Sequence, residues 1–365
     1  MSKHGKVLVA MSGGIDSSVT AMMLHEQGYE VIGITMKTWD YESSGSSKRE
    51  TGCCSLDSIN DARTMAVSFG FPHYILDIRG EFGETIINNF VDEYLAGRTP
   101  NPCVLCNTHI KWDALLKRAN MLDCEYIATG HYAQIREANS RKVIYKGVDL
   151  TKDQTYVLWG LSQESLRRTI FPLGQFKKTE IKQMAKDAGF YDLANKSESY
   201  DICFVPDNDY RTFLKHKRPD LEEAVAGGDF IFKGKKVGEH KGYPFYTVGQ
   251  RRGLEIALGA PVFVKEIIPE SNTVVLGDKD DLAENRLNIR DYNLIKYDTL
   301  PQDFVGLTKI RYKDAGTMAT IHSQDAKLEV IFHESVNGVA PGQSAVIYEG
   351  NDLVGGGFID RREFL

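Results

Sequence analysis

The sequence predicts an α/β protein in which a Rossmann-like domain with a parallel sheet is followed by a small central, mostly β domain and a C-terminal β-barrel. Three observations lead to this prediction. Short β-type runs alternate strictly with helical segments through about residue 200. The composition then shifts near Tyr210, and evenly spaced strand-like runs fill the chain from about Arg290. Strict alternation favours a parallel sheet covered by helices on both faces.

The elements of the first part follow from apolar periodicity and from glycine stop signals. We expect strands at residues 6–10, 31–36, 74–78 and 126–129, and helices at residues 17–28, 56–69, 84–95 and 110–120. Residues 139–147 indicate a small hairpin, and helical character returns over residues 153–190. Ligands of such sheets bind beyond the carboxyl ends of the strands, so the loops at that edge are the candidates for function.

The second part of the chain has the turn-rich pattern of β domains. Many glycines and short apolar runs between Gly227 and Gly277 predict a small β insert. Further on, strands are expected at residues 309–312, 318–322, 328–332, 344–348 and 358–359, separated by turn signals such as Asn337-Gly338. This spacing predicts a small closed barrel. We therefore expect three domains, covering residues 1–208, 209–280 and 281–365.

Composition limits the classes of function. A chain of 365 residues suggests two or three domains, and 42% hydrophobic with 26% charged residues is typical of globular proteins. The net charge of −6 does not indicate a nucleic-acid binder, so any grip on RNA would use local basic patches. The Gly249-Gln250-Arg251-Arg252-Gly253 turn is one such site, or else simply a solvated basic turn.

The length of the apolar runs, at the N-terminus and elsewhere, predicts the cellular location. The apolar stretch from Val7 to Met11 is too short for a signal peptide, and no run of about 18 apolar residues suggests a membrane span. We expect a cytoplasmic protein whose six cysteines are reduced at rest. Their spacing is then interpreted as chemistry or metal binding before a disulfide framework.

A glycine and serine string between the first strand and the first helix predicts an anion site. Backbone N–H groups and a helix N-terminus bind phosphate there, and two glycines allow close approach. The string lacks the lysine of a Walker A motif, while Asp16 suits a Mg²⁺ ion shared with pyrophosphate. The simpler interpretation is a tight turn with an N-cap serine. We call this segment the nucleotide loop; it reads Ser12-Gly13-Gly14-Ile15-Asp16-Ser17-Ser18.

Two cysteines in separate loops suggest sulfur chemistry. Cys106 ends a segment that contains two prolines, which we call the cysteine loop (residues 97–106). A helix is expected to follow this loop and to stabilise the Cys106 thiolate. Cys203 lies in a second loop. Beside a nucleotide site, one thiol could carry a terminal sulfur while the other attacks to release it, closing a disulfide.

Other cysteine interpretations stay open. Cys103-x-x-Cys106 has the spacing of zinc or iron–sulfur ligands, with Cys203 as a third ligand, although no second close pair completes a set of four. Cys124 precedes a strand and is expected to be a small core residue. Cys53-Cys54 follows a polar loop and is either part of a lid or an edge of the core.

The nucleotide loop resembles the pyrophosphate loop of the PP-loop ATPases. The resemblance implies a PP-loop domain that uses ATP with Mg²⁺, cleaves between the α- and β-phosphates and transfers AMP to an oxygen of the substrate. The residues it implies at the nucleotide are Ala10, Met11, Ser12, Gly13, Gly14, Ile15, Asp16, Ser17, Met36 and Gly130. Taken alone, Met36 would more often be a core residue.

Over nearly its full length the chain resembles the tRNA-specific 2-thiouridylases. The shared blocks, in the same order, are residues 12–18, the Cys-Ser-Leu-Asp-Ser region from residue 54, and residues 97–107, 129–132, 152–156, 201–204, 247–254 and 311–312. The resemblance implies ATP-dependent 2-thiolation of the wobble uridine, position 34 of tRNA, through an adenylated C2 oxygen. It also implies tRNAs for Lys, Glu and Gln as substrates and an upstream protein as sulfur donor.

The same resemblance implies roles for individual residues. Cys106 would be the nucleophile and Cys203 the persulfide carrier, with no metal in the persulfide mechanism. Asn101, Pro102 and Cys103 would line the pocket of the target base. The remaining residues expected to meet the tRNA are Lys152, Asp153, Gln154, Arg311 and Tyr312. Arg311-Tyr312 is expected on a strand, and Asp153 would otherwise serve as a helix cap.

One position departs from the family pattern, which usually has aspartate where this chain has Cys103. A thiol, with a pKa near about 8.5, cannot simply replace a carboxylate as general base. The substitution therefore favours the cluster alternative or a role for Cys103 as a resolving thiol.

Two other functions remain as alternatives. The first is another PP-loop adenylating ligase, which uses ammonia or an amine and needs neither Cys106 nor Cys203. The second is a non-catalytic RNA-binding or sulfur-carrier scaffold, against which the intact Gly13, Gly14 and Asp16 count.

Overall fold

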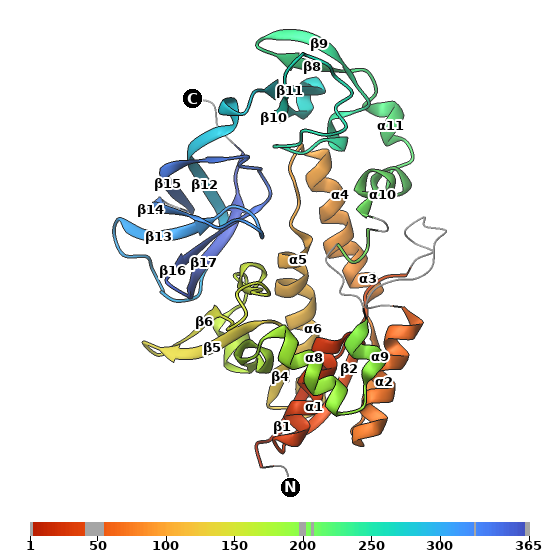
Figure 1. Cartoon of the computed structure of the whole chain (residues 1–365). Helices are drawn as coiled ribbons and strands as arrows, with labels where there is room; N and C mark the ends of the chain where they lie inside the picture. The colour runs from red at the N-terminus through yellow and green to blue at the C-terminus, as the bar shows by residue number, and fades with distance from the viewer. Residues whose placement is uncertain (1–2, 41–54, 197–201, 206–207, 325, 362–365) are drawn as a thin grey trace. The chain divides into compact units, whose positions relative to one another are not determined.

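The chain forms two compact units in the computed structural model, which describes residues 3–40, 55–196, 202–205, 208–324 and 326–361 (Figure 1). Unit 1 comprises Met1–Ile86, Cys103–Asn208 and Asn351–Leu353, and unit 2 comprises Ile87–Pro102, Asp209–Gly350 and Val354–Leu365. Cys53 and Cys54 lie outside the described residues.

Unit 1 is built on a five-stranded parallel sheet in the order β3-β2-β1-β4-β7. Its strands are β1 (Lys6–Ala10), β2 (Glu30–Lys37), β3 (His73–Asp77), β4 (Tyr126–Ala128) and β7 (Thr169–Ile170). Val7, Leu8 and Val9 are fully buried, as expected for a central strand covered on both faces. The predicted parallel α/β domain is confirmed.

Helices follow these strands and pack on them. The helices of unit 1 are α1 (Ile15–Glu26), α2 (Leu56–Phe69), α3 (Arg79–Phe82), α6 (Trp112–Met121), α7 (Gln163–Arg167), α8 (Lys178–Asp187) and α9 (Tyr191–Asn195). In α2, Gly70 ends the helix in a left-handed conformation, as predicted, and the Ser55 side chain caps the first turn. Residues of α1, α2, α8 and α9 share one hydrophobic core.

Smaller elements complete unit 1. The predicted hairpin is present as β5 (Ala133–Ala138) and β6 (Arg141–Lys146), paired antiparallel. Two short 3₁₀ turns follow, at Thr155–Val157 and Pro172–Gln175.

Two helices differ from the prediction in extent. The helix expected at residues 84–95 begins earlier, as α3, a π-helical turn (Gly83–Ile87) and α4 (Asn88–Leu95) in sequence. The helix expected at residues 110–120 begins at Pro102, as α5 (Pro102–Leu105), a π-helical segment η3 (Cys106–Lys111) and α6. Proline is favoured in the first helical turn because its missing N–H has no partner there in any case.

Unit 2 contains the small β sheet and the barrel. The sheet has the order β10-β11-β8-β9, with β8 (Gly228–Phe232), β9 (Lys235–His240), β10 (Phe263–Ile268) and β11 (Thr273–Gly277). Helices α4, α10 (Tyr210–Lys217) and α11 (Leu221–Ala224) belong to the same unit, with 3₁₀ turns at Tyr243–Phe245, Pro269–Ser271 and Asp280–Leu282. The aromatic rings of Phe90 in α4 and Phe213 in α10 pack edge to face.

The barrel has the strand order β12-β15-β14-β13-β16-β17 and is closed by pairing of β12 with β17. Its strands are β12 (Ala283–Leu294), β13 (Phe304–Lys309), β14 (Thr317–Gln324), β15 (Lys327–Asn337), β16 (Ser344–Glu349) and β17 (Asp352–Ile359). Alternate residues such as Ile321, Val330 and Ile347 fill the interior. The predicted closed barrel is confirmed.

The prediction of a strand at residues 309–312 is wrong. Strand β13 ends at Lys309, and Arg311 and Tyr312 lie in the turn that follows. The Ile310 N–H donates to the Asp314 carboxylate at 3.0 Å, and the Asp314 N–H donates to the Arg311 carbonyl at 3.1 Å. This side-chain bond takes the donor that a strand would use and closes a turn instead.

Among the described residues, no helix has both the length and the apolar character needed to span a membrane.

Candidate active site

The nucleotide loop follows β1 at the carboxyl edge of the parallel sheet and leads directly into α1. Its start is fixed to β2, because the Met11 N–H donates to the Ile34 carbonyl at 2.8 Å and Thr35 Oγ1 donates to the Met11 carbonyl at 2.7 Å. Ser17 Oγ accepts from the Ser12 N–H at 3.0 Å. The loop is therefore preformed at the edge where α/β sheets bind their ligands.

Two glycines are required by close backbone approach. Gly13 has φ +67°, and a Cβ atom there would lie 1.9 Å from the Ser58 carbonyl oxygen. A Cβ on Gly130 would lie 2.9 Å from the Asp16 carbonyl carbon and 2.9 Å from the Ser17 nitrogen. Gly130, which follows β4, therefore lies against the start of α1.

Asp16 is held by two residues that the sequence analysis did not assign to the site. Tyr132 donates its hydroxyl to Asp16 Oδ1 at 2.8 Å, and Lys178 Nζ lies 2.8 Å from both carboxylate oxygens. Lys178 is only 6% exposed and opens helix α8. A lysine in a first helical turn gives no signal of this role, whereas Tyr132 lies in the shared Thr-Gly-His-Tyr block.

A second lysine braces the loop from another side. Lys196 Nζ is 3.3 Å from the Gly13 carbonyl oxygen and 2.7 Å from Asp61 Oδ2. The same amine lies 3.2 Å from Ser58 Oγ. Cations therefore approach the loop at Gly13 and at Asp16, which suits an anionic ligand.

The loop has the chemistry for a nucleotide phosphate with Mg²⁺. Asp16 offers a hard oxygen donor, and its side chain remains 32% exposed despite the contact with Lys178. A carboxylate has room for further partners beyond one ammonium group. Met36 is half-buried near the carboxyl end of β2, at the same edge.

The cysteine loop differs from its predicted form. Cys106 was expected near a helix N-terminus, but the helical stretch begins at Pro102, so Cys103 occupies the first turn and Cys106 opens the π-helical segment η3. Cys103 is exposed and Cys106 is buried. Cys106 therefore lies beyond the first turn, which is the part of a helix where the dipole stabilises a thiolate.

Cys203 is linked to the region of Cys106 by packing within unit 1. It is exposed in a turn closed by the Val205 N–H and the Ile202 carbonyl at 3.0 Å. The neighbouring Phe204 packs edge to face on Phe82 of α3, and α3 packs on η3. The Cys103, Cys106 and Cys203 side chains are not in disulfides.

The remaining cysteine predictions concern a core position and a metal site. Cys124 is buried next to β4, as expected for a small core residue. Within the described ranges, no group of three His, Cys, Asp or Glu side chains is placed to hold a metal ion. Support for a cluster on Cys103, Cys106 and Cys203 therefore rests on sequence spacing.

Lys111, in η3, acts on two groups around the cysteine loop. Desolvation by the surrounding protein atoms raises the pKa of the Cys103 thiol even though part of the residue is exposed, and the Lys111 charge opposes that shift. Burial and the same charge lower the pKa of His131 to about 3, so its ring is neutral at pH 7. Lys111 Nζ also donates to Asn107 Oδ1 at 3.0 Å, which fixes the amine within the segment.

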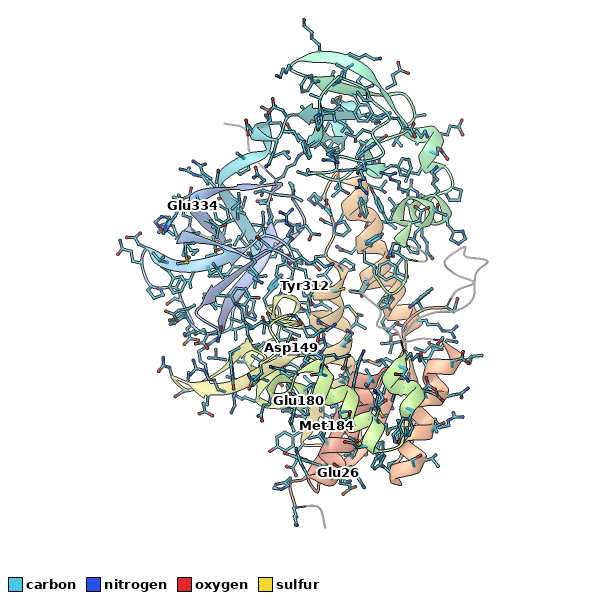
Figure 2. All side chains as sticks on the ribbon, in the orientation of Figure 1. Glu26, Asp149, Glu180, Met184, Tyr312 and Glu334 are labelled. Carbon is cyan, nitrogen blue, oxygen red and sulfur yellow. The ribbon has the colours of Figure 1, made fainter. Side chains whose placement is uncertain are left out.

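The residues expected to meet RNA are placed in two units. In unit 1, Gln154 and Tyr132 exchange two hydrogen bonds, at 2.9 and 3.1 Å, and Asp153 accepts from the Thr155 N–H and hydroxyl. Asp153 thus caps a short turn, while Lys152 is half-buried. In unit 2, Tyr312 is 44% exposed (Figure 2) and Arg311 is exposed.

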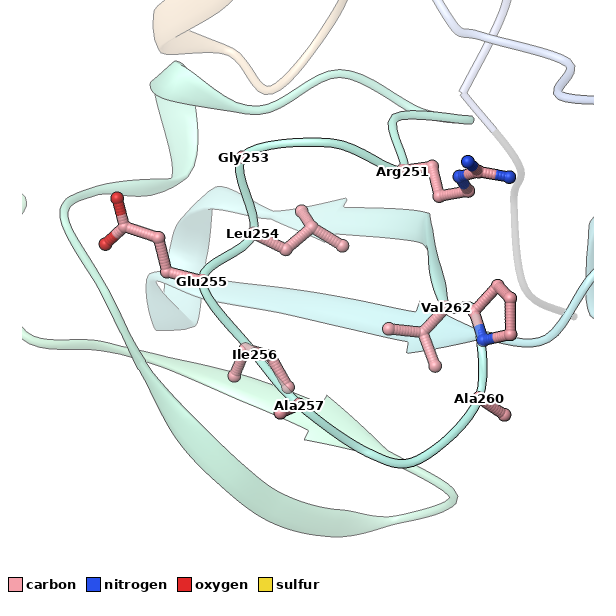
Figure 3. Close-up of a pocket in the computed structure, with 9 residues that line it drawn as sticks. Arg251, Gly253, Leu254, Glu255, Ile256, Ala257, Ala260 and Val262 are labelled. Atoms are coloured by element: carbon pink, nitrogen blue, oxygen red, sulfur yellow. The ribbon is translucent and has the colours of Figure 1, made fainter.

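The basic turn of unit 2 lines a hollow of about 490 Å³ (Figure 3). Leu254 and Val262 point toward each other inside it, whereas Glu255 points away. Arg251 extends at one end. The lining combines apolar side chains with the charged Arg251 and Glu255, and both arginines of the turn are exposed.

Comparison with known proteins identifies the family. Residues 5–207 match the family described as "tRNA methyl transferase HUP domain". Residues 211–278 match a "tRNA methyl transferase PRC-barrel domain", and residues 286–359 match an "Aminomethyltransferase beta-barrel domain". The descriptions of these families refer to methyl or aminomethyl transfer.

Curated relatives over the full length carry a different name. A "tRNA-specific 2-thiouridylase MnmA" of Cytophaga hutchinsonii is 64% identical, covering 98% of both chains. Proteins of the same name from Amoebophilus asiaticus and Salinibacter ruber are 61% and 56% identical, covering 98% of this chain and 96% and 95% of theirs. On this identity and coverage, the chain belongs to the tRNA-specific 2-thiouridylase family.

Proposed function

We propose that this protein is an ATP-dependent tRNA-uridine 2-sulfurtransferase that thiolates the wobble uridine, position 34, of tRNA. The observation that carries the proposal is full-length membership of the family together with a preformed nucleotide loop and three thiols in the same unit. AMP and pyrophosphate are the other products. The upstream sulfur donor is a separate protein.

The first step is adenylation. The C2 oxygen of the uridine attacks the α-phosphorus of ATP, and pyrophosphate leaves. Backbone N–H groups of the nucleotide loop and the N-terminus of α1 bind the phosphates, with Met36 and Gly130 beside the nucleotide. Asp16 would hold Mg²⁺, which neutralises the leaving pyrophosphate.

The second step replaces oxygen by sulfur. Cys203 carries the persulfide, and its exposed position suits loading by a donor protein. The Cys106 thiolate attacks the inner sulfur, forms a Cys106–Cys203 disulfide and releases the terminal sulfur as hydrosulfide. That sulfur attacks C2, and AMP leaves with the original oxygen. A thiol reductant of two electrons restores both cysteines.

Substrate recognition completes the proposal. Asn101, Pro102 and Cys103 line the pocket of the flipped base, while Lys152, Asp153 and Gln154 contact the tRNA. Arg311 and Tyr312 bind it from the barrel, where their exposure allows contact with phosphate and base. The tRNAs for Lys, Glu and Gln are the proposed substrates, in the cytoplasm. Three domains, residues 1–208, 209–280 and 281–365, divide this work.

The test begins with anaerobic purification and measurement of iron. ATP-dependent sulfur transfer to unmodified tRNA is then assayed for the wild type and for Cys103→Ala, Cys106→Ala and Cys203→Ala. We expect iron-free protein to be active, with loss of at least about a thousand-fold for Cys106→Ala and Cys203→Ala only. If activity tracks iron and all three substitutions abolish it, the cysteines are ligands and the persulfide mechanism is wrong. Turnover by Cys106→Ala with an amine in place of sulfur would indicate another adenylating ligase.

A further inference from the structure

The segment leading to Cys106 is divided between the two units. Residues up to Pro102 belong to unit 2, and Cys103 begins a stretch of unit 1. Pro100 and Pro102 have no N–H, so this segment cannot join a regular ladder in which donors and acceptors alternate. Its carbonyl groups need donors from elsewhere in the chain.

Gln343 supplies these donors from the barrel. Its side-chain Nε2 donates to the Pro100 carbonyl at 2.8 Å and to the Thr99 carbonyl at 3.2 Å. One amide group has two N–H bonds, so a single side chain satisfies two neighbouring carbonyls. The sequence separation is 243 residues for Pro100, which explains why periodicity gave no sign of the contact.

The backbone that carries Gln343 is itself fixed. Its N–H donates to the Ala340 carbonyl at 3.2 Å, and its carbonyl accepts from the Ile359 N–H of β17 at 2.7 Å. Gln343 directly precedes β16, whose first residue, Ser344, is fully buried. The amide therefore projects from a rigid edge of the barrel rather than from a flexible loop.

Adjacent contacts hold the same stretch. The Thr99 N–H donates to the Pro341 carbonyl at 2.7 Å, and Asn101 Nδ2 donates to Ser344 Oγ at 3.2 Å. A Cβ atom on Gly342, which has φ +87°, would lie 2.8 Å from the Thr99 carbonyl oxygen. The barrel edge and the cysteine loop are thus in direct backbone contact, and residues 99–101 are each bonded to it.

The near end of the loop is anchored as well. Arg98 Nε and Nη2 donate to the two Glu93 carboxylate oxygens at 2.7 and 2.5 Å. Glu93 lies in α4 and is only 9% exposed, so the pair has the bidentate, shielded geometry of a strong ion pair. Its partner Arg98 consequently has a raised pKa.

We propose that Gln343 is a positioning residue for sulfur transfer, because it holds the segment that sets the place of Cys106. The cysteine lies four residues beyond Pro102, the last residue of this stretch of unit 2. This inference rests on the proposed function for its activity arm only. Through it, the C-terminal barrel has a second task besides contacting tRNA: it presents the loop of the nucleophile.

The test uses an isosteric change. Gln343→Glu keeps the size of the side chain but replaces two donors by acceptors that face two carbonyls, and Gln343→Ala removes the group. Gln324→Glu and Gln324→Ala are matched controls, because Gln324 is an exposed glutamine of the same barrel whose side chain donates to Glu329. Full-length protein is compared by thermal unfolding, hydrogen exchange of residues 94–106 and alkylation of Cys106 by iodoacetamide, read by mass spectrometry.

We expect both Gln343 variants to raise exchange locally over residues 94–106 and to change the alkylation rate of Cys106 by about ten-fold, the order expected for the loss of two hydrogen bonds. Sulfur transfer at saturating ATP and tRNA should fall by a similar factor, with KM values unchanged. The Gln324 variants should match the wild type. Unchanged exchange and alkylation in Gln343→Glu, or equal changes in both pairs, would overturn the proposal. If the wild type fails to thiolate tRNA, the proposed function fails, while exchange and alkylation still decide the positioning role.

Discussion

The nucleotide loop and the cysteine loop are supported in different ways. The contacts described above for the nucleotide loop, from Ile34 to Lys196, lie within unit 1. The cysteine loop instead begins in unit 2, where Gln343 and Ser344 of the barrel hold it, and ends in unit 1. The nucleotide loop is thus held within one unit, whereas the segment that leads to the Cys106 thiol is held within the other.

This difference has a physical consequence for function. Binding of a nucleotide needs only fixed N–H groups and cations, which a single strand–helix junction provides. The proposed sulfur transfer needs a thiol at a defined position, and the segment that leads to Cys106 is hydrogen-bonded to the barrel within unit 2 as far as Asn101.

The largest effect on stability is expected at Gly13, where the nucleotide loop has no space for a side chain. Gly13→Ala places a Cβ atom 1.9 Å from the Ser58 carbonyl oxygen at φ +67°, so backbone must move. We expect a loss of about 3 kcal/mol in the free energy of unfolding and weaker binding of ATP. Urea unfolding and calorimetry with a non-hydrolysable ATP analogue measure the two quantities.

The neighbouring glycine is the matched control. Gly14 has φ −94°, and a Cβ atom there meets only Ser12 Oγ, at 3.5 Å. Gly14→Ala should therefore change the unfolding free energy by less than about 1 kcal/mol. Equal losses in the two variants would mean that the loop is not as tightly packed as its geometry shows. Neither variant should alter Cys106 alkylation, which separates this loop from the cysteine loop.

A smaller effect is expected from the buried lysine beside Asp16. Lys178→Met removes the ammonium group that lies 2.8 Å from both carboxylate oxygens. Since Asp16 is 32% exposed, water partly compensates, and we expect a loss of about 2 kcal/mol in unfolding free energy. Affinity for the ATP analogue with Mg²⁺ should fall by about ten-fold because a cation at the phosphate site is lost.

Lys182→Met serves as the control, since Lys182 lies on the same helix one turn further along. It should leave affinity for the analogue unchanged. If Lys178→Met binds the analogue as tightly as the control does, Lys178 only stabilises the fold, and the positive charge near the nucleotide loop comes from Lys196 and the backbone.

The sequence predicted the parts of this molecule whose signals are local. Gly70 ended a helix, the alternation of strands and helices gave the parallel sheet, and turn signals gave the barrel. The nucleotide loop is a contiguous string, so its place between β1 and α1 followed directly. In each case the residues that determine the structure are neighbours in the chain.

Other features depend on partners that are distant in sequence. Lys178 meets Asp16 across 162 residues, and Gln343 meets Pro100 across 243. Arg311 was placed on a strand because the side-chain bond from Ile310 to Asp314 cannot be seen in a periodicity. The start of the helix at Pro102, ahead of Cys106, was missed because the prolines were interpreted as part of a rigid loop.

The smallest effect is expected at His131, whose ring packs on Trp112 and Phe171 in unit 1. The pKa of His131 is lowered to about 3 by burial and by the charge of Lys111 in η3. The unfolded chain binds a proton at about pH 6.5. The folded state therefore loses stability as pH falls below about 6.5, and the loss continues toward pH 3.

His131→Gln should remove this dependence. The quantity to compare is the change in unfolding free energy between pH 7 and pH 5.5. We expect this loss to be about 1 kcal/mol larger in the wild type than in the variant. His109→Gln, an exposed histidine of η3, is the control. Identical pH profiles for the two variants would place His131 in contact with water. That result would also contradict an electrostatic effect of Lys111 on His131. The same charge opposes the raised pKa of Cys103.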